Sequence, residues 1–206
     1  MGSVRLRVVV RGLSPLIVRT LDVLGSATLD VVHEALLVCF GWSGECLHEF
    51  TIRAAGYSSD WMVDACDTRD VTIDSLGLRV GERFTWRYDF LAGWVIDLRV
   101  EAVTGDELAT IRCVSGRRAG PPEWCGGPAG FQAWEDSHSL LEFLECIGEL
   151  RDGVDAYGAP VDPDYLEDRL VALARWVGRV RFGKAVVDRR LTVLEVRPCV
   201  SLSRSG

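Results

Sequence analysis

The sequence predicts an α+β domain in which a mixed or antiparallel β-sheet packs against helices and the C-terminal region is helical. Short segments with apolar residues at every second position occupy most of the first 115 residues, interrupted by one helical pattern near residue 30. Two further helical patterns follow residue 138. Three segments that carry Trp and Gly, residues 40–50, 86–98 and 120–131, lie along the β-rich part.

The clearest strand pattern is at residues 4–10, where apolar side chains alternate with Arg5, Arg7 and Val9. Other extended segments are predicted at residues 15–23, 47–53, 83–90, 94–103 and 108–114, with Gly105-Asp106 as a hairpin turn between the last two. Residues 54–77 are predicted to be a mixed loop. Residues 116–130 contain five Gly and three Pro, so we expect no regular structure there.

Capping residues mark the predicted helices. Thr28 is the expected N-cap of the first helix, and Gly41 is expected to end it. Ser139 and Glu142 form a capping box for a second helix at residues 139–150. A third helix is expected at residues 162–177 and a last element at 186–196. We interpret residues 1–206 as one domain, with an α+β core at 1–134 and a helical C-terminal extension at 135–206.

Composition narrows the class of protein. Apolar residues make up 48% and charged residues 26% of the 206 residues, which is typical of a globular protein rather than a disordered one. The net charge of −7 gives no general attraction to nucleic acid or anionic membranes. No apolar run approaches the ~20 residues that span a bilayer. The seven cysteines are odd in number and form no CxxC pair, so we expect reduced thiols in the cytoplasm.

The first Trp- and Gly-bearing segment places a thiol near an imidazole. On a strand, Cys46, His48 and Phe50 share one face, and His33 on the preceding helix can approach the same place. A Cys and a His in this arrangement can form a nucleophile–base pair. Together His33, Cys46 and His48 are candidate metal ligands. The alternative, which short motifs favour, is a hydrogen-bonded His beside a buried Cys with no chemical role.

The second segment is aromatic on one strand face, because residues 84, 86, 88 and 90 are all aromatic. Such a face either walls a ligand pocket or packs in the core. The candidate ligand-binding residues of all three segments are Trp42, Trp86, Tyr88, Trp94 and Trp124. Asp89 lies on the opposite strand face, where it is either a catalytic acid or the cap of a turn.

The third segment, residues 120–131, combines Pro and Gly in a way that restricts its backbone and indicates a shaped loop. Glu123 and Cys125 are its candidate catalytic groups, and the segment lacks the Lys of a phosphate-binding loop. We favour a structural loop folded over the aromatic face. A separate basic run extends from Arg175 to Arg190; it is either a nucleic-acid contact or, more commonly, a solvated helix end.

In this order, the three segments resemble the plasmid pRiA4b ORF-3-like family, which also includes passenger proteins of insertion elements. The resemblance covers most of the chain and implies an α+β fold, an association with plasmids and transposons, and no established reaction. The matching residues are Pro15, Ile17 and Arg19; Gly41, Trp42, Leu47, His48 and Phe50; Tyr88, Asp89, Phe90 and Trp94; and Cys113, Gly116, Pro121, Pro122, Glu123, Gly126, Gly127 and Gly130.

Departures from the family pattern remove polar groups. The resemblance places a His where this chain has Cys46, another where it has Ile96, and an Asp where it has Trp124. It also places a Trp at Val18 and Gly-Asp at Leu91-Ala92. This chain therefore keeps the Trp, Gly and Pro framework of the pattern while losing groups that could ligate a metal or move a proton.

These observations lead to three functional hypotheses. The first is a non-catalytic binding or accessory protein whose Trp-lined pocket or surface takes a protein or a small molecule. The second is an enzyme that uses Cys46 or Cys125 with His48, with or without a metal. Nucleic-acid binding through the late arginines ranks third. We predict no cofactor, with a divalent metal as the weaker alternative, and the sequence leaves the oligomeric state open.

Overall fold

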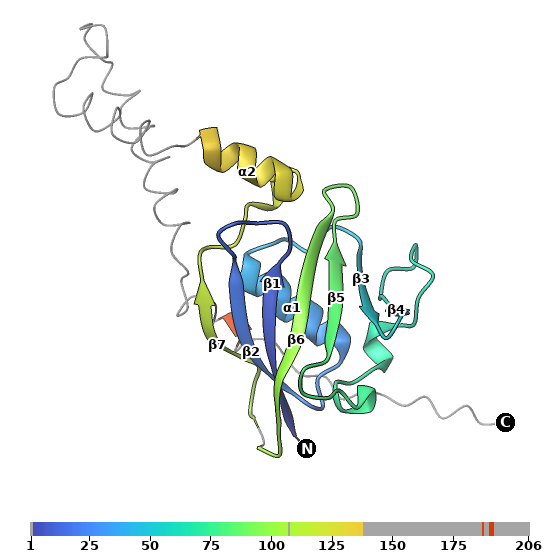
Figure 1. The fold of residues 1–206 in the computed structure, drawn as a ribbon. Coiled ribbons are helices and arrows are strands. Elements are labelled where there is room, and N and C mark those ends of the chain that lie inside the picture. Colours follow the sequence, from blue (N-terminus) through green and yellow to red (C-terminus); the bar gives the residue numbers. More distant parts are fainter. Residues whose placement is uncertain (1, 107, 138–186, 188–189, 192–206) are drawn as a thin grey trace, which may run out of the picture.

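The computed structural model describes residues 2–106, 108–137, 187 and 190–191 (Figure 1). Its strands are β1 Ser3–Val10, β2 Val18–Leu24, β3 His48–Ile52, β4 Ala55–Tyr57, β5 Arg83–Tyr88, β6 Trp94–Thr104 and β7 Arg112–Arg117. Its α-helices are α1 Leu29–Phe40 and α2 Gly127–Ser137, and its short 3-10 helices are η1 Thr68–Asp70, η2 Asp74–Leu76 and η3 Glu123–Cys125.

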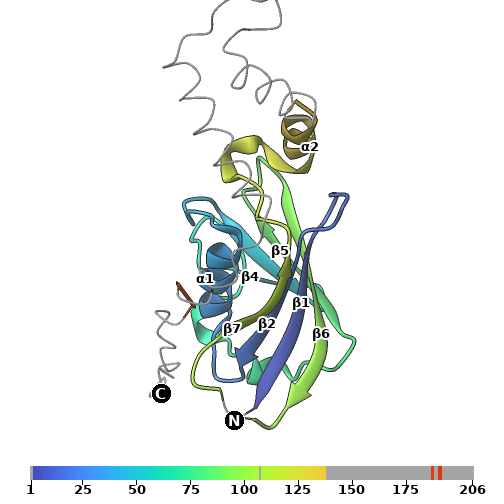
Figure 2. The same cartoon turned by 90° about the vertical axis from the view of Figure 1, so that its left-hand side faces the viewer.

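The strands form one seven-stranded sheet in the order β4-β3-β5-β6-β1-β2-β7, and every neighbouring pair is antiparallel. Helix α1 lies across one face, and the other face has no helix from the described residues over it (Figures 1 and 2). The α+β class is therefore confirmed, and the sheet is the antiparallel one of the two predicted types.

Strand β1, inside the sheet between β6 and β2, shows why the sheet has two unlike faces. Its apolar side chains, from Val4 to Val10 at every second position, are buried on the α1 side, as the alternation predicts. Arg5 and Arg7 point to the other face. Strand β6 repeats this pattern, with Leu98 buried and Arg99 exposed. The core thus lies between the sheet and α1, and the opposite face is charged.

Helix α1 begins and ends where the sequence predicts. The Thr28 hydroxyl accepts a hydrogen bond from the Val31 amide at 3.4 Å. Gly41 ends the helix in the left-handed region at φ 76°, and its amide donates to the Leu37 carbonyl at 2.8 Å. Most of the helix is buried, including His33, which is 5% exposed. The helix therefore positions a histidine in the core.

Four local predictions are wrong. Gly105-Asp106 does not make a hairpin turn, because β1 and β2 lie between β6 and β7 in the sheet. Residues 54–77 were expected to be a loop, but β4 pairs with β3 around a tight turn at Arg53 and Ala54, which have φ of 50° and 68°. Neither residue is the Gly or Asn that usually marks such a turn. Strand β7 lies later than the predicted 108–114. Helix α2 begins inside the segment expected to be irregular, because Pro128 is tolerated in a first helical turn.

The predicted C-terminal elements lie largely outside the described residues. This holds for the helices at 139–150 and 162–177 and for nearly all of the basic run from Arg175 to Arg190. In the last predicted element, Val187 and Leu191 are helical and belong to the buried core. Within the part of the chain that the structure describes, no helix is both long and apolar enough to cross a membrane.

Candidate functional site

Four of the five candidate ligand-binding rings form a packed cluster beneath α1. The Trp42 ring centroid lies 5.1 Å from that of Tyr88, 5.9 Å from Trp86 and 5.3 Å from Trp94. Trp86, Tyr88 and Trp94 are fully buried, and Trp42 is 6% exposed. These rings make up the aromatic core of the protein, so a ligand reaches them only if the fold opens. Trp124, by contrast, is 68% exposed.

The three Trp- and Gly-bearing segments are joined by hydrogen bonds at the edge of this cluster. The indole of Trp42 donates to the Pro121 carbonyl at 2.9 Å. The carboxylate of Glu123 accepts from the Ser43 amide at 2.7 Å, from the Ser43 hydroxyl at 3.0 Å and from the Tyr88 hydroxyl. Burial and this contact with Glu123 raise the pKa of Tyr88. We call this set of bonds the Glu123 junction.

Close backbone approaches explain glycines of the third segment. A Cβ at Gly120 would lie 2.2 Å from the Phe40 carbonyl oxygen, and one at Gly127 would lie 1.9 Å from that of Ala92. Gly127 also has φ of 84°, in the left-handed region. The loop therefore rests directly on the end of α1 and on the β5–β6 turn. This arrangement agrees with the structural loop over the aromatic face that the sequence favours.

Two histidines are stacked in the core. The rings of His33 on α1 and His48 on β3 lie 3.6 Å apart with 11° between their planes, so the predicted approach of His33 to His48 is confirmed. The Nδ1 atom of His48 lies 3.1 Å from a carboxylate oxygen of Asp60. Burial lowers the pKa of both rings, and that of His33, which also lies beside the second imidazole, falls to about 3.

Both imidazoles are therefore neutral near pH 7, and each leaves one ring nitrogen without a partner. The Nδ1 atom of His33 and the Nε2 atom of His48 are buried and make no hydrogen bond to any described residue. With Asp60 at Nδ1 of His48, the proton is assigned to that nitrogen and the lone pair to Nε2. The pair is thus a neutral, unprotonated base closed off from solvent, because His48 is 3% exposed.

The candidate nucleophiles are not activated. Burial raises the pKa of Cys46, and the nearby charges of Asp89 and Glu123 raise it further. Burial also raises the pKa of Cys125, whose sulfur lies 3.8 Å from the Gly127 carbonyl oxygen. Among the described residues, neither ring nitrogen of His48 is hydrogen bonded to a cysteine. Both thiols are therefore protonated at neutral pH, the opposite of a catalytic cysteine.

The remaining acidic candidate caps a turn. Asp89 has φ of 49°, and its carboxylate accepts from the amides of Leu91 at 3.2 Å and Ala92 at 3.1 Å. No group of three or more His, Cys, Asp or Glu side chains within the described ranges is arranged to hold a metal ion. A metal bound by His33, Cys46 and His48 stays an untested prediction, as does any catalytic role for these candidates.

Two residues of the site were missed by sequence reasoning. Asp60 lies in the predicted loop at 54–77, where nothing in the sequence indicates contact with His48. Arg19 matches the family pattern but was given no role. It is 1% exposed and donates to four carbonyl groups, and burial lowers its pKa to about 10. Its match to the family pattern was the one indication of a role in the sequence. In the structure Arg19 links the end of α1 to β7.

Fold and site together define an antiparallel α+β protein in which three segments distant in sequence close around a buried aromatic cluster. A family model described as "Plasmid pRiA4b ORF-3-like protein" matches residues 2–145. The chain belongs to this plasmid pRiA4b ORF-3-like family. The segments that carried the resemblance are the ones joined at the Glu123 junction.

A curated relative and a solved structure are similar to this chain. The uncharacterised protein y4hQ of Sinorhizobium fredii is 31% identical over 153 residues, covering 71% of this chain and 73% of the relative. The crystal structure of the protein of unknown function MM3350 from Methanosarcina mazei Go1 covers 79% of this chain and 96% of its own, with a TM-score of 0.60. Because its sequence is 21% identical, this second likeness supports the fold alone.

Proposed function

We propose that this chain is a non-catalytic binding protein, and that its family's signature segments serve to build its fold. One observation carries the proposal: the candidate acids are hydrogen bonded within the fold, and the candidate thiols are protonated at neutral pH. Glu123 accepts three hydrogen bonds at its junction, and Asp89 caps a turn. The thiols of Cys46 and Cys125 have raised pKa values. A catalytic site keeps such groups open to substrate.

The surface that supports partner binding lies beside the Glu123 junction. Gly127 rests on Ala92, which brings the loop of Trp124 next to the β5–β6 turn that carries Leu91. Leu91 is fully exposed, and Trp124 packs edge to face with Trp134. We call Leu91, Trp124 and Trp134 the apolar end. Leu91 and Trp124 are exposed and Trp134 is half-buried, and exposed apolar residues of this kind are typical of a protein contact, so we propose a protein partner here.

The cell compartment and genetic context are also proposals. All five cysteines among the described residues are free thiols, which supports a reducing compartment such as the cytoplasm. The family's description refers to a plasmid, and this supports an accessory role for the chain in a mobile element.

Elemental analysis and native mass spectrometry of the purified full chain test the non-catalytic proposal. We expect no stoichiometric metal. A metal at one per chain that is lost in His48→Ala but kept in Trp124→Ala would overturn it, because it would show that the histidine pair is a working metal site. Trp124→Ala is the matched control, since it alters an exposed ring outside the core.

A second candidate function rests on the carboxylate–imidazole pair. Asp60 orients His48 and leaves its Nε2 lone pair unpartnered, which is how a general base is held. His48 can act as a general base only if the fold opens, because its ring is stacked on His33 and shielded from solvent. Hydrogen exchange at the β3 amides tests it. Exchange of the His48 region on the timescale of global unfolding alone would rule out a general base.

A further inference from the structure

A row of arginines crosses the sheet face opposite α1. In the register of the sheet, Arg83 on β5 lies opposite Arg99 on β6, and Arg99 lies opposite Arg7 on β1. The row continues to Thr20 on β2 and Ser115 on β7. Neighbouring strands are about 4.8 Å apart, so three guanidinium groups start from backbone positions within about 10 Å. We call these five residues the arginine row.

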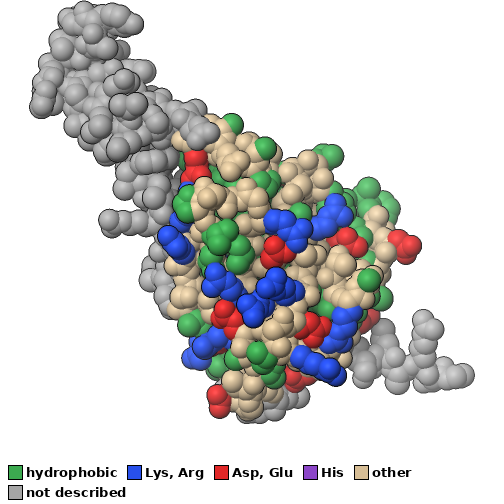
Figure 3. Space-filling model, in the orientation of Figure 1, with side chains coloured by type: hydrophobic (Ala, Val, Ile, Leu, Met, Phe, Trp, Pro, Cys, Tyr) green, Lys and Arg blue, Asp and Glu red, His purple; other side chains and the backbone are tan. Residues whose placement is uncertain are grey.

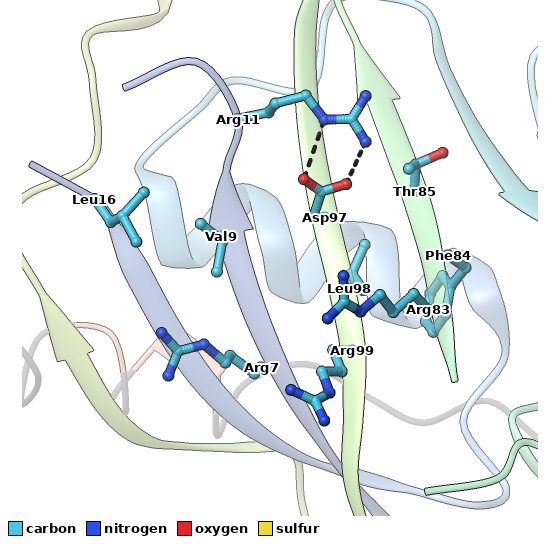
Figure 4. Close-up of a pocket in the computed structure, with 10 residues that line it drawn as sticks. All are labelled: Arg7, Val9, Arg11, Leu16, Arg83, Phe84, Thr85, Asp97, Leu98 and Arg99. Carbon is cyan, nitrogen blue, oxygen red and sulfur yellow. Dashed lines mark hydrogen bonds and ion pairs between the residues drawn. The ribbon is translucent and has the colours of Figure 1, made fainter. Parts of the chain in front are cut away.

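The charges of this row are not compensated. Arg7, Arg83 and Arg99 are exposed, and none forms an ion pair with a carboxylate among the described residues. The one carboxylate that lines the larger hollow beside this row, Asp97, is bound by Arg11 (Figure 4). Like charges directly opposite each other on adjacent strands destabilise a sheet. The fold therefore carries an unfavourable interaction that a bound anion would relieve.

A neighbouring row shows the ordinary arrangement. There Asp22 on β2 lies between Arg5 and Arg112 and binds both, at 2.7 Å and 3.0 Å. These two arginines hold the pKa of Asp22 below its usual range. The same face thus contains one row with its own carboxylate and one row without. The absence of a carboxylate is specific to the arginine row and is not a general property of the face.

The arginine row lies in a shallow trough. One hollow of about 510 Å³ is lined by Arg7, Arg83 and Arg99, and a second of about 290 Å³ shares Arg7 and Leu16 with it. Figure 3 shows basic side chains gathered at the centre of this face, open to view, and Figure 4 shows Arg7 and Arg99 extending over the same part of it. No helix among the described residues lines the trough, and only Arg11 and Leu16 of the β1–β2 loop lie at its edge, so it suits a chain that lies across the sheet.

The residues of the trough favour nucleic acid over an acidic protein. Protein interfaces have an apolar core with aromatic residues and few charges, whereas nucleic-acid interfaces are polar and strongly positive. Arginines are the commonest residues of this lining, and its one aromatic residue among those described, Phe84, is only 4% exposed. Guanidinium groups bind phosphate oxygens in a bidentate way, and hydroxyl groups such as those of Thr20 and Ser115 are also phosphate donors.

We propose that the arginine row binds the phosphodiester backbone of nucleic acid without sequence preference. The contacts are from Arg7, Arg83 and Arg99 to successive phosphates, which carry no sequence information. The chain's net charge of −7 limits this attraction to the row itself. This proposal is independent of the protein-binding role proposed for the apolar end and does not use the late basic run.

Fluorescence anisotropy with a labelled DNA of arbitrary sequence, single-stranded or duplex, tests the proposal on the full chain. With three phosphate contacts on duplex DNA, we expect log K to fall with log salt at a slope of roughly −2.7, which is roughly 40-fold weaker binding between about 50 and 200 mM salt. The triple variant Arg7→Gln, Arg83→Gln, Arg99→Gln is expected to bind on the order of tenfold more weakly or worse, with a flatter slope.

The matched control is Arg69→Gln, which removes a positive charge from η1 on the α1 side of the sheet. It is expected to bind DNA as the unmodified chain does. Unchanged binding by the triple variant, or no binding by the unmodified chain at about 50 mM salt, would overturn the proposal. Poly-glutamate that competes as well as DNA would also overturn it, because the surface would then suit an acidic protein. The thermal unfolding of each variant shows that it is folded.

Discussion

Two regions of the molecule, the Glu123 junction and the arginine row, treat their polar groups in opposite ways. At the junction, the Glu123 carboxylate and the Trp42 indole are hydrogen bonded to neighbours in the fold. On the outer face, Arg7, Arg83 and Arg99 stand opposite one another with no carboxylate among the described residues. A group that is paired within the fold contributes to stability, whereas an unpaired charge in a fixed position remains available to a ligand. The family's signature segments thus belong to the first kind.

The largest expected effect comes from breaking the aromatic cluster. Trp42→Ala removes a buried ring and its hydrogen bond to Pro121, and we expect the free energy of unfolding to fall by about 3–5 kcal/mol. Trp124→Ala removes the same side chain from an exposed position and is expected to cost less than about 1 kcal/mol. Urea denaturation measures both. Equal losses would contradict the distinction between core rings and exposed rings.

Because His33 and His48 are buried in the neutral form, we expect the stability of the fold to fall at acid pH. The folded-state pKa values of His33 and His48 lie below the unfolded value of about 6.5. The two neutral rings therefore make their full contribution to the free energy of unfolding above about pH 6.5. This contribution is lost as pH falls toward 3, where His33 titrates in the folded protein. For His33 alone we expect a loss of about 2 kcal/mol between pH 7 and pH 5.

Denaturation at a series of pH values measures this effect. A His33→Gln variant is the comparison, because it removes the ring that is more strongly shifted and retains a polar side chain. Its free energy of unfolding is expected to depend less on pH over the same interval. A dependence as steep as that of the unmodified chain would show that other groups cause the acid sensitivity.

Breaking the Glu123 junction is expected to lower the free energy of unfolding by less than Trp42→Ala does. Glu123→Gln weakens three hydrogen bonds, one of them to Tyr88, and we expect a loss of about 2 kcal/mol at neutral pH. The control is Glu34→Gln on the exposed side of α1, for which a change within about 0.5 kcal/mol is expected. A free energy of unfolding that is unchanged in Glu123→Gln would show that the junction is not structural.

The smallest expected change in stability distinguishes the arginine row from the row that contains Asp22. Arg99→Gln removes like-charge repulsion, so we expect no loss of stability or a gain of up to about 0.5 kcal/mol. Arg5→Gln breaks an ion pair with Asp22 and is expected to cost up to about 1 kcal/mol. Thermal unfolding at low salt measures the difference, which should shrink as salt is added. A loss of stability in Arg99→Gln together with a gain in Arg5→Gln would contradict the contrast between the two rows.

Local patterns made much of the fold predictable. The alternation in β1 and the caps of α1 at Thr28 and Gly41 lie within a few residues of the structure they cause. Strand β4 was missed because its turn uses Arg53 and Ala54, and α2 was missed because a Pro- and Gly-rich segment can still begin a helix. These misses arise where tertiary contacts outweigh local preference.

The site was predictable only in part. The resemblance gave the order of the three segments, and the face of α1 indicated that His33 can approach His48. The pairing of His48 with Asp60 joins a strand to a loop and has no sequence pattern. The arginine row depends on the register of strands that are distant in sequence, and a shift of one residue would turn each arginine to the other face. No reading of single segments could find it.

DNA binding and unfolding, measured on the same two variants, separate the binding face from the structural junction. The triple Arg7→Gln, Arg83→Gln, Arg99→Gln variant is expected to lose DNA binding and keep its stability. Glu123→Gln is expected to lose stability and keep DNA binding while folded. The reverse pattern, with DNA binding lost in Glu123→Gln and retained in the triple variant, would contradict the division of the molecule into a structural junction and a binding face.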